Sequence, residues 1–238
     1  MTADAPAPNP LELIDLQART LFRHDSVGRL TAINEPGDQS APRLFLGRTP
    51  AGNIWRVRHD LPADLIDELE AAISDERITP DLRKPPVSLQ CLLDVLEKQT
   101  PVERVWQGPA WYVPETVAVS MEIEPVVIDD GELLSATFGG SVQSWVESAP
   151  CLAIVERGQP VSACFSARTS ARASEAGVET LPEFRRRGYA SAVTAAWAQQ
   201  VRTVGRIPLY STSWDNLASQ HVAKRLGLVL YGADLHIT

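Results

Sequence analysis

The sequence predicts an α+β protein built around a mixed sheet, and three features of its second half support this fold class. Residues 151–155 and 161–167 are apolar runs joined by the turn sequence Arg157–Pro160, as in a β-hairpin. A strand pattern, a basic loop and an amphipathic helix follow one another over residues 174–201. The chain closes with a strand, a helix and a strand over residues 207–237. Hairpins combined with helical connections are typical of a mixed sheet.

The first half predicts a smaller α+β unit, which we place at residues 11–104. Residues 1–10 are rich in Pro and Ala and are expected to be disordered. In the unit itself, helices are expected where apolar residues recur at helical spacing, and strands where β-formers cluster between turn sequences. The expected helices are residues 11–22, 61–74 and 87–97. The expected strands, which would form a small antiparallel meander, are residues 28–34, 43–47 and 53–59.

The larger domain is placed at residues 105–238, where the pattern becomes rich in β-formers. Residues 116–123 alternate between apolar and polar and predict a strand. Residues 133–146 are expected to be helical in parts, with an interruption at Gly139-Gly140.

Composition excludes several classes of protein. The 238 residues are 44% hydrophobic and 22% charged, as in an ordinary soluble protein. A formal charge of −8 argues against a general nucleic-acid binder, which needs an excess of Lys and Arg. Cys91, Cys151 and Cys164 lack C-x-x-C spacing, so buried thiols in a reducing compartment are expected rather than disulfides or a metal site. With no signal peptide and no apolar run that could span a membrane, we expect a cytoplasmic protein.

A short basic loop dominates the second half of the chain. It reads Arg185-Arg186-Arg187-Gly188-Tyr189-Ala190 and follows a strand pattern that Pro182 ends. A helix begins at once, since Val193, Trp197 and Val201 recur at four-residue spacing. The first N–H groups of a helix have no partner within the helix, and the helix dipole attracts anions to them. Arginines beside such a helix start indicate a pyrophosphate site; the alternative is a solvated basic turn.

Two motifs carry a resemblance to a known family. Arg185-x-x-Gly188-x-Ala190 resembles the Q/R-x-x-G-x-G/A loop of the GNAT superfamily of N-acetyltransferases, which holds the pyrophosphate of acetyl-coenzyme A (acetyl-CoA). Residues 211–228 are similar to the family's later segment N-x-A-S-x-x-V-A-x-K-L-G, with Arg225 in place of the lysine. The residues in register are Asn216, Ala218, Ser219, Val222, Ala223, Leu226 and Gly227. The resemblance covers residues 115–238 and implies a sheet whose central strands splay apart.

The resemblance implies acetyl-CoA as co-substrate and no metal. It assigns the pyrophosphate contact to residues 185–190, which are Arg185, Arg186, Arg187, Gly188, Tyr189 and Ala190. It assigns main-chain contacts with the pantetheine arm to Val178, Thr180 and Leu181. Asn216 and Ser219 match positions that often face this arm, although Ser219 could equally be a plain helix residue.

Two glutamates are candidates for the catalytic base. Glu175 and Glu179 lie four residues apart on one expected strand, which places both carboxylates on the same face. Some members of the family use a strand glutamate near here to deprotonate the amine, and Glu179 is expected to be the main base. A second carboxylate nearby would raise the pKa of one of the pair. The alternative is a solvent-facing edge or an ion pair with Arg168 or Arg172.

The general acid of the family is missing from its usual place. Many members have a tyrosine four residues before the glycine that ends the last helix, and Ala223 stands there in this chain. Tyr189, Tyr210 and Tyr231 remain as candidates, each of which could instead be a packing residue.

The resemblance therefore implies an acetyl-CoA-dependent N-acetyltransferase in which a primary amine attacks the thioester directly. The alternative is a coenzyme A-binding regulatory module without turnover, which the absent helix tyrosine favours. A nucleotide-phosphate binder is disfavoured, because the chain has no G-x-x-x-x-G-K-[ST] loop. The acceptor is expected to be the amine of a small molecule or a peptide, and the N-terminal unit is expected to shape its side of the site. The sequence leaves a homodimer open.

Overall fold

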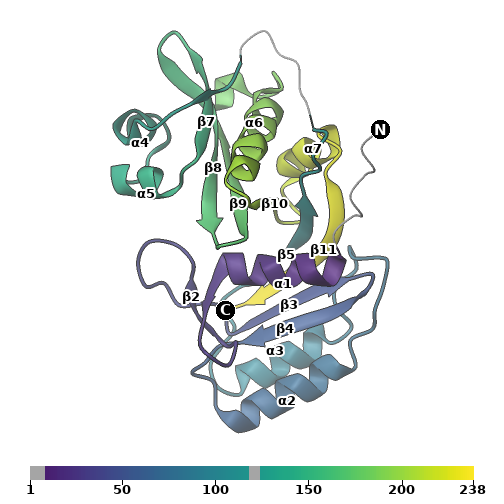
Figure 1. Ribbon diagram of the computed structural model, residues 1–238. Coiled ribbons are helices and arrows are strands. Elements are labelled where there is room, and N and C mark those ends of the chain that lie inside the picture. Colours follow the sequence, from purple (N-terminus) through teal and green to yellow (C-terminus); the bar gives the residue numbers. More distant parts are fainter. Residues whose placement is uncertain (1–8, 118–123) are drawn as a thin grey trace.

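The computed structural model describes residues 9–117 and 124–238 (Figure 1). Within that part of the chain, nine strands form one mixed sheet in the order β4-β3-β11-β5-β10-β9-β8-β7-β6. Only β9 and β10 pair in parallel. The strands are β3 (Leu44–Thr49), β4 (Gly52–Val57), β5 (Val105–Tyr112), β6 (Val126–Val127), β7 (Cys151–Glu156), β8 (Gln159–Thr169), β9 (Ala173–Thr180), β10 (Ile207–Ser211) and β11 (Val229–Ile237). The prediction of a mixed α/β sheet is confirmed.

Helices cover both faces of the sheet (Figure 1). One face packs against α1 (Pro10–Leu21), α4 (Gly131–Phe138) and α5 (Val142–Glu147). The other packs against α2 (Ala63–Ser74), α3 (Leu89–Glu97), α6 (Tyr189–Thr203) and α7 (Leu217–Arg225). A separate hairpin, β1 (Phe22–His24) and β2 (Leu30–Ile33), lies beside α1. The described helices include none that is long and apolar enough to cross a membrane.

The sheet continues across the boundary that we placed between residues 11–104 and 105–238. β3 pairs with β11 from Leu44 opposite Ile237 to Arg48 opposite Ala233. The apolar residues of α2 and α3 share a buried cluster with residues of β11. The N-terminal residues therefore add two strands to the sheet, which the sequence could not indicate because strand pairing over this separation leaves no local pattern.

Strand β5 was not predicted from the sequence. It contains Gly108 and Pro109, and such residues argue against a central strand, yet it lies between β10 and β11. Gly108 is required there, because a Cβ atom would come within 1.8 Å of the carbonyl oxygen of Thr212. Of the strand expected at residues 116–123, residues 118–123 lie outside the described residues. The expected break at Gly139-Gly140 is found between α4 and α5.

The cysteines differ in part from expectation. All three are free thiols, and Cys151 and Cys164 are buried, but Cys91 is exposed.

Candidate active site

The sheet opens between β9 and β10. These strands pair in parallel only from Ala173 opposite Ile207 to Glu175 opposite Leu209, although β9 continues to Thr180 and β10 to Ser211. Beyond Glu175 the two strands therefore diverge, and main-chain groups along the gap are left for another partner. This divergence is the splay of the central strands that the resemblance implied.

The basic loop forms an anion-binding helix start. A short 3-10 turn, Pro182–Phe184, leads into the loop, in which Arg186 and Gly188 have left-handed φ angles of 62° and 87°. The first helical hydrogen bond runs from the Ala192 N–H to the Gly188 carbonyl at 3.1 Å. The N–H groups ahead of it have no carbonyl one turn back, and they gather at the positive end of the α6 dipole. Such an arrangement suits a phosphate group.

Arg225 of α7 joins this loop. A Cβ atom on Gly188 would meet the Arg225 guanidinium at 3.1 Å, so the glycine is what allows the cation to lie over the loop. We did not assign Arg225 to the site from the sequence. The second motif could have indicated it, because Arg225 stands where the family motif has a lysine, and both side chains are cations.

The other side chains of the loop mostly hold its shape. Arg187 pairs with Glu156 of β7 at 3.6 Å and lies 4.9 Å from the centroid of the Phe184 ring. The Tyr189 hydroxyl donates to the same Glu156 carboxylate. Arg187 and Tyr189 thus tie the loop to the sheet, which leaves Arg186 and Arg225 as the cations best placed for a ligand.

Main-chain groups of β9 face the gap at alternate residues. The Leu181 N–H bonds to the Val161 carbonyl at 3.0 Å, toward β8. Alternation along the strand turns the main-chain groups of Val178 and Thr180 the other way. The Thr180 carbonyl accordingly accepts from Arg185 Nε at 3.3 Å, on the loop side. Val178 and Thr180 fit the expected role toward a pantetheine arm, whereas the N–H group of Leu181 is already used.

Both residues proposed from α7 have partners inside the protein. The Asn216 side chain caps the helix by accepting from the Ser219 N–H at 3.0 Å. The Ser219 hydroxyl lies 2.6 Å from the hydroxyl of Tyr210. Tyr210 packs against Ala223, so the ring from β10 fills the space that a small helix residue leaves. Burial raises the pKa of Tyr210, which keeps its hydroxyl protonated.

Glu175 and Glu179 share a face of β9 but not an environment. Glu175 is 4% exposed, and the Ser211 hydroxyl donates to its Oε1 at 2.6 Å. Burial raises the pKa of Glu175 to about 7, and the nearby carboxylate that adds to this effect is Asp234 of β11. Glu179 is exposed. The alternative ion pair with Arg168 is not formed, because Arg168 Nε donates to Glu35 at 2.8 Å.

A cluster of buried polar groups surrounds Glu175 beneath α1. Glu175 and Asp234 both act on the pKa of Tyr231, which burial raises well above its usual value. Asp234 Oδ2 is 2.9 Å from Nε2 of His236. Five of its buried atoms have no hydrogen-bond partner among the described residues: Gln17 Nε2 and Oε1, Glu175 Oε2, Tyr231 OH and Asp234 Oδ1. Unpaired polar atoms at this depth are costly and rare, so the cluster is a candidate functional region.

Comparison with known proteins identifies the domain. Residues 132–233 match the model of the GNAT acetyltransferase family. This part of the chain is a GNAT acetyltransferase domain. The prediction made from the two motifs is thereby confirmed, and the family supports an acetyltransferase activity in general.

Several solved structures are similar to the chain. A putative GNAT acetyltransferase from Novosphingobium aromaticivorans is 16% identical over 57% of this chain and 65% of its own, with a TM-score of 0.49. A GCN5-related N-acetyltransferase-like protein from Streptococcus suis is 18% identical over 86% of this chain and 87% of its own, with a TM-score of 0.49. A GCN5-related N-acetyltransferase from Kribbella flavida is 17% identical over 98% of this chain and 96% of its own, with a TM-score of 0.48. No curated protein matches the chain.

The GNAT domain has a cavity of about 300 Å³ on the face that carries Glu179. The indole N–H of Trp145 donates to the Gly139 carbonyl at 2.8 Å, and its ring meets Phe165 edge-on at 4.7 Å. The lining residues include two carboxylates, three aromatic rings and an N-terminal segment: Glu35, Pro36, Phe138, Trp145, Phe165 and Glu179. None of these except Glu179 was singled out from the sequence, because they come together only through β8, β9, α4 and α5.

Proposed function

We propose that the chain is an acetyl-CoA-dependent N-acetyltransferase that acts on a primary amine by direct attack. The observation that carries this proposal is Glu175, a buried carboxylate with a pKa of about 7. It lies where β9 and β10 cease to pair and diverge, a point that we call the fork. A base with a pKa near the operating pH is suited to accept the proton of an attacking amine. The GNAT match at residues 132–233 supports the class of reaction.

The residues around the fork fit acetyl-CoA as the second substrate, which would supply the activated acetyl group. The loop N–H groups with Arg186 and Arg225 would hold its pyrophosphate, and Val178 and Thr180 would bond to the pantetheine amides. Gly188 is the position where a side chain would obstruct this contact.

The reaction balances with groups at the fork. The amine nitrogen attacks the thioester carbonyl, forming the C–N bond, and the C–S bond then breaks with sulfur leaving as a thiolate. The amine proton passes to Glu175. Tyr210, held protonated beside Ser219, is the hydroxyl that would donate to the leaving sulfur.

This assignment moves the base from Glu179 to Glu175 and gives Glu179 a different task. Glu179 lines the 300 Å³ cavity with Glu35 and the rings of Phe138, Trp145 and Phe165. Carboxylates and aromatic faces both attract an ammonium group. We therefore place the body of the acceptor, with any second cationic group it carries, in this cavity, and Glu35 is the contribution of the N-terminal segment. The reacting amine would extend about 13 Å along β9 from Glu179 to reach Glu175.

A Gly188→Glu substitution should abolish the binding of acetyl-CoA. The new side chain would meet Arg225, strain a residue with φ of +87° and bring a negative charge to the phosphate site. In the unsubstituted protein, acetyl-CoA at about a hundred times its Kd should stabilise the fold by roughly 2.7 kcal/mol, measured as a rise in Tm. Gly205→Glu is the matched control, because Gly205 has φ of +74° and open space around it. A folded Gly188→Glu protein that keeps the full rise would refute the loop assignment.

A Glu179→Gln substitution should raise KM for a cationic amine by about three- to fivefold, the effect of one exposed charge, with little change in kcat. Initial rates over a range of amine concentrations give both constants, and Glu97→Gln, on the far helix α3, is the control. A hundredfold fall in kcat with unchanged KM would instead make Glu179 the base.

The rival function is a coenzyme A-binding module without turnover, which Ala223 in the usual tyrosine position leaves open but which the GNAT match does not favour. Release of the coenzyme A thiol, measured across a panel of small-molecule and peptide amines, separates the two. Acetyl-CoA binding with no thiol release from any amine would favour the module.

A further inference from the structure

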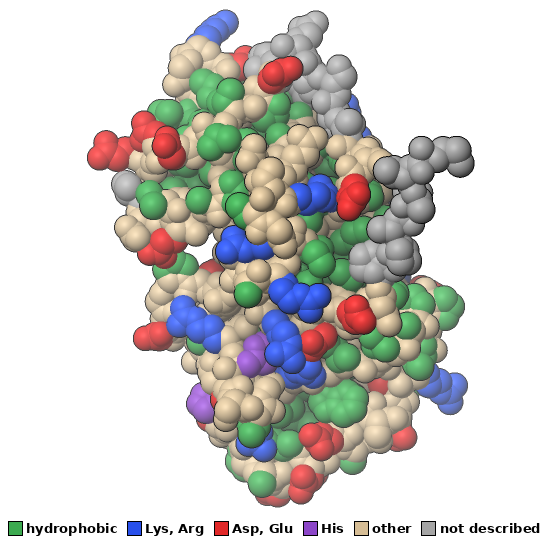
Figure 2. Space-filling view, in the orientation of Figure 1, with side chains coloured by type: hydrophobic (Ala, Val, Ile, Leu, Met, Phe, Trp, Pro, Cys, Tyr) green, Lys and Arg blue, Asp and Glu red, His purple; other side chains and the backbone are tan. Residues whose placement is uncertain are grey.

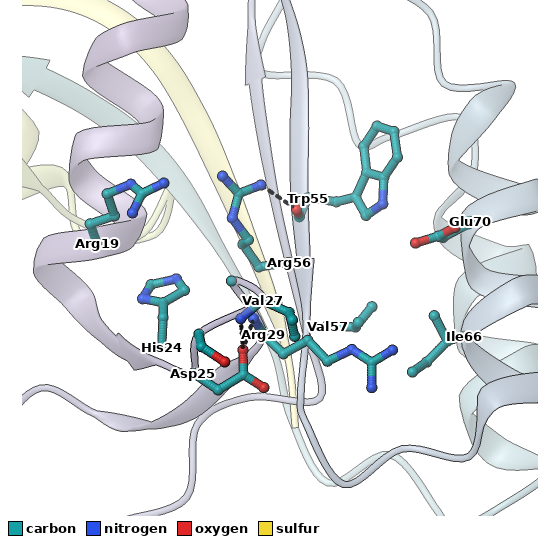
Figure 3. A pocket seen from close by; sticks show the side chains of 12 residues that line it. Arg19, His24, Asp25, Val27, Arg29, Trp55, Arg56, Val57, Ile66 and Glu70 are labelled. Carbon is teal, nitrogen blue, oxygen red and sulfur yellow. Dashed lines mark hydrogen bonds between the residues drawn. The ribbon is translucent and has the colours of Figure 1, made fainter.

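A second cavity lies at the free edge of the sheet, away from the acetyl-transfer site (Figure 3). It measures about 710 Å³ and is bounded by the β1–β2 hairpin, the edge strand β4, and helices α1 and α2. Five strand-to-strand steps separate β4 from β9 in the sheet order. At about 4.8 Å for each step, the cavity is roughly 24 Å from the fork. Any ligand it holds is therefore separate from the two substrates proposed above.

Three arginines from three segments line this cavity: Arg19 of α1, Arg29 of the hairpin loop and Arg56 of β4. Asp15 pairs with Arg19 at 2.8 Å and also with Arg56, and so holds these two side by side. The guanidinium of Arg29 has no ion pair or hydrogen bond within residues 9–117 and 124–238, and its side chain extends across the cavity toward Ile66 of α2 (Figure 3). One Asp thus serves two Arg side chains, and the guanidinium of Arg29 is left without a direct partner, although its charge helps to lower the pKa of Asp25.

The imidazole of His24 lies near two of these arginines. Burial lowers the pKa of His24, and the charges of Arg56 and Arg19 lower it further. Asp15 opposes them with a smaller effect than either arginine. Nε2 of His24 is buried without a partner among the described residues. At His24, therefore, the charges of the two arginines outweigh that of Asp15, in a chain whose net charge is −8. In Figure 2, Lys and Arg side chains gather near the middle of this face beside His side chains.

Two further carboxylates, Asp25 and Glu70, line the cavity, so with Asp15 its three arginines face three acids. Asp25 is used by the loop itself, since its Oδ1 accepts from the N–H groups of Val27 at 3.0 Å and Arg29 at 2.8 Å. Glu70 stands on α2, on the wall opposite Arg19 and His24 (Figure 3). Apolar surface from Trp55, Val57 and Ile66 lies between. A volume of this size suits a small organic ligand rather than a bare ion.

We propose that this cavity binds a small organic anion, a carboxylate or phosphate monoester with an apolar body. The guanidinium of Arg29 would bond to the charged group, and Trp55, Val57 and Ile66 would contact the body.

Phenyl phosphate is a suitable probe, with benzyl alcohol as its uncharged counterpart. Both are titrated into Gly188→Glu protein, so that the phosphate site of the basic loop does not contribute. The readout is the indole N–H resonance of Trp55 in the NMR spectrum, assigned with Trp55→Phe. We expect a saturable shift with phenyl phosphate and none with benzyl alcohol at the same concentration.

Arg29→Gln tests the charge directly, because among the described residues its guanidinium makes no hydrogen bond or ion pair that the substitution could break. It should weaken binding by about tenfold or more, as for the loss of one charge-assisted hydrogen bond. Arg157→Gln, at the exposed turn between β7 and β8, should bind as before. No saturable shift, an equal shift with benzyl alcohol, or unchanged affinity in Arg29→Gln would each overturn the proposal.

Discussion

Glu175→Gln should lower kcat for amine acetylation by about a hundredfold or more, the usual contribution of a general base. Gln cannot accept the proton of the amine, whereas it fills the same space beside Ser211. Acetyl-CoA affinity should stay within about twofold, since the loop at residues 185–190 is untouched. Steady-state rates and the acetyl-CoA Tm shift, measured on the same preparation, separate these two effects. A Glu175→Gln enzyme with near-normal kcat would remove Glu175 from the mechanism.

The pH dependence of kcat/KM is a second test of Glu175 as the base. A base must be deprotonated, so kcat/KM should rise with pH through about 7, the pKa of Glu175. The charge of Asp234 raises this pKa, so Asp234→Asn should move the rising limb to lower pH. If the limb stays in place, Asp234 is not coupled to the catalytic carboxyl.

The stability of the fold should also depend on Glu175. Burial raises its pKa from 4.5 in the unfolded chain to about 7 in the fold, so over this range the folded state binds more protons. The free energy of unfolding should therefore fall as pH rises from 4.5 to about 7 and be independent of this group above that. At about 1.4 kcal/mol for each tenfold change, the loss is roughly 3 kcal/mol.

Glu175→Gln should remove this pH dependence and be more stable than the unsubstituted protein at pH values above the folded pKa. Urea unfolding at a series of pH values measures it, with Glu179→Gln as the exposed control on the same strand. Parallel pH curves for the unsubstituted protein and Glu175→Gln would show that Glu175 ionises as freely in the fold as in the unfolded chain.

The parts of this site that sequence could predict are those built from one short segment. The loop at residues 185–190 and the helix after it combine a turn glycine, clustered charge and helical spacing within a few residues. The hairpin around Arg157–Pro160 and the cap at Asn216 are local in the same way. For such elements, the conformation that the local sequence favours is the one found in the folded protein.

Other parts depend on pairing between distant residues. Gly108 and Pro109 argue against a strand locally, yet β5 lies in the sheet between β11 and β10. The glycine is needed because the carbonyl of Thr212 packs where a side chain of residue 108 would be. Glu175 and Asp234 lie on β9 and β11, two strands that β10 and β5 separate, so no local pattern indicates that the charge of Asp234 acts on Glu175. This is why the sequence led us to Glu179 as the partner of Glu175.

The most direct test of the proposed function is to identify the products formed from acetyl-CoA and a panel of primary amines. Mass spectrometry should find an acetylated amine and free coenzyme A in equal amounts with the unsubstituted protein, and neither with Gly188→Glu. Free coenzyme A without any acetylated amine, or acetyl-CoA binding with no products at all, would contradict an N-acetyltransferase.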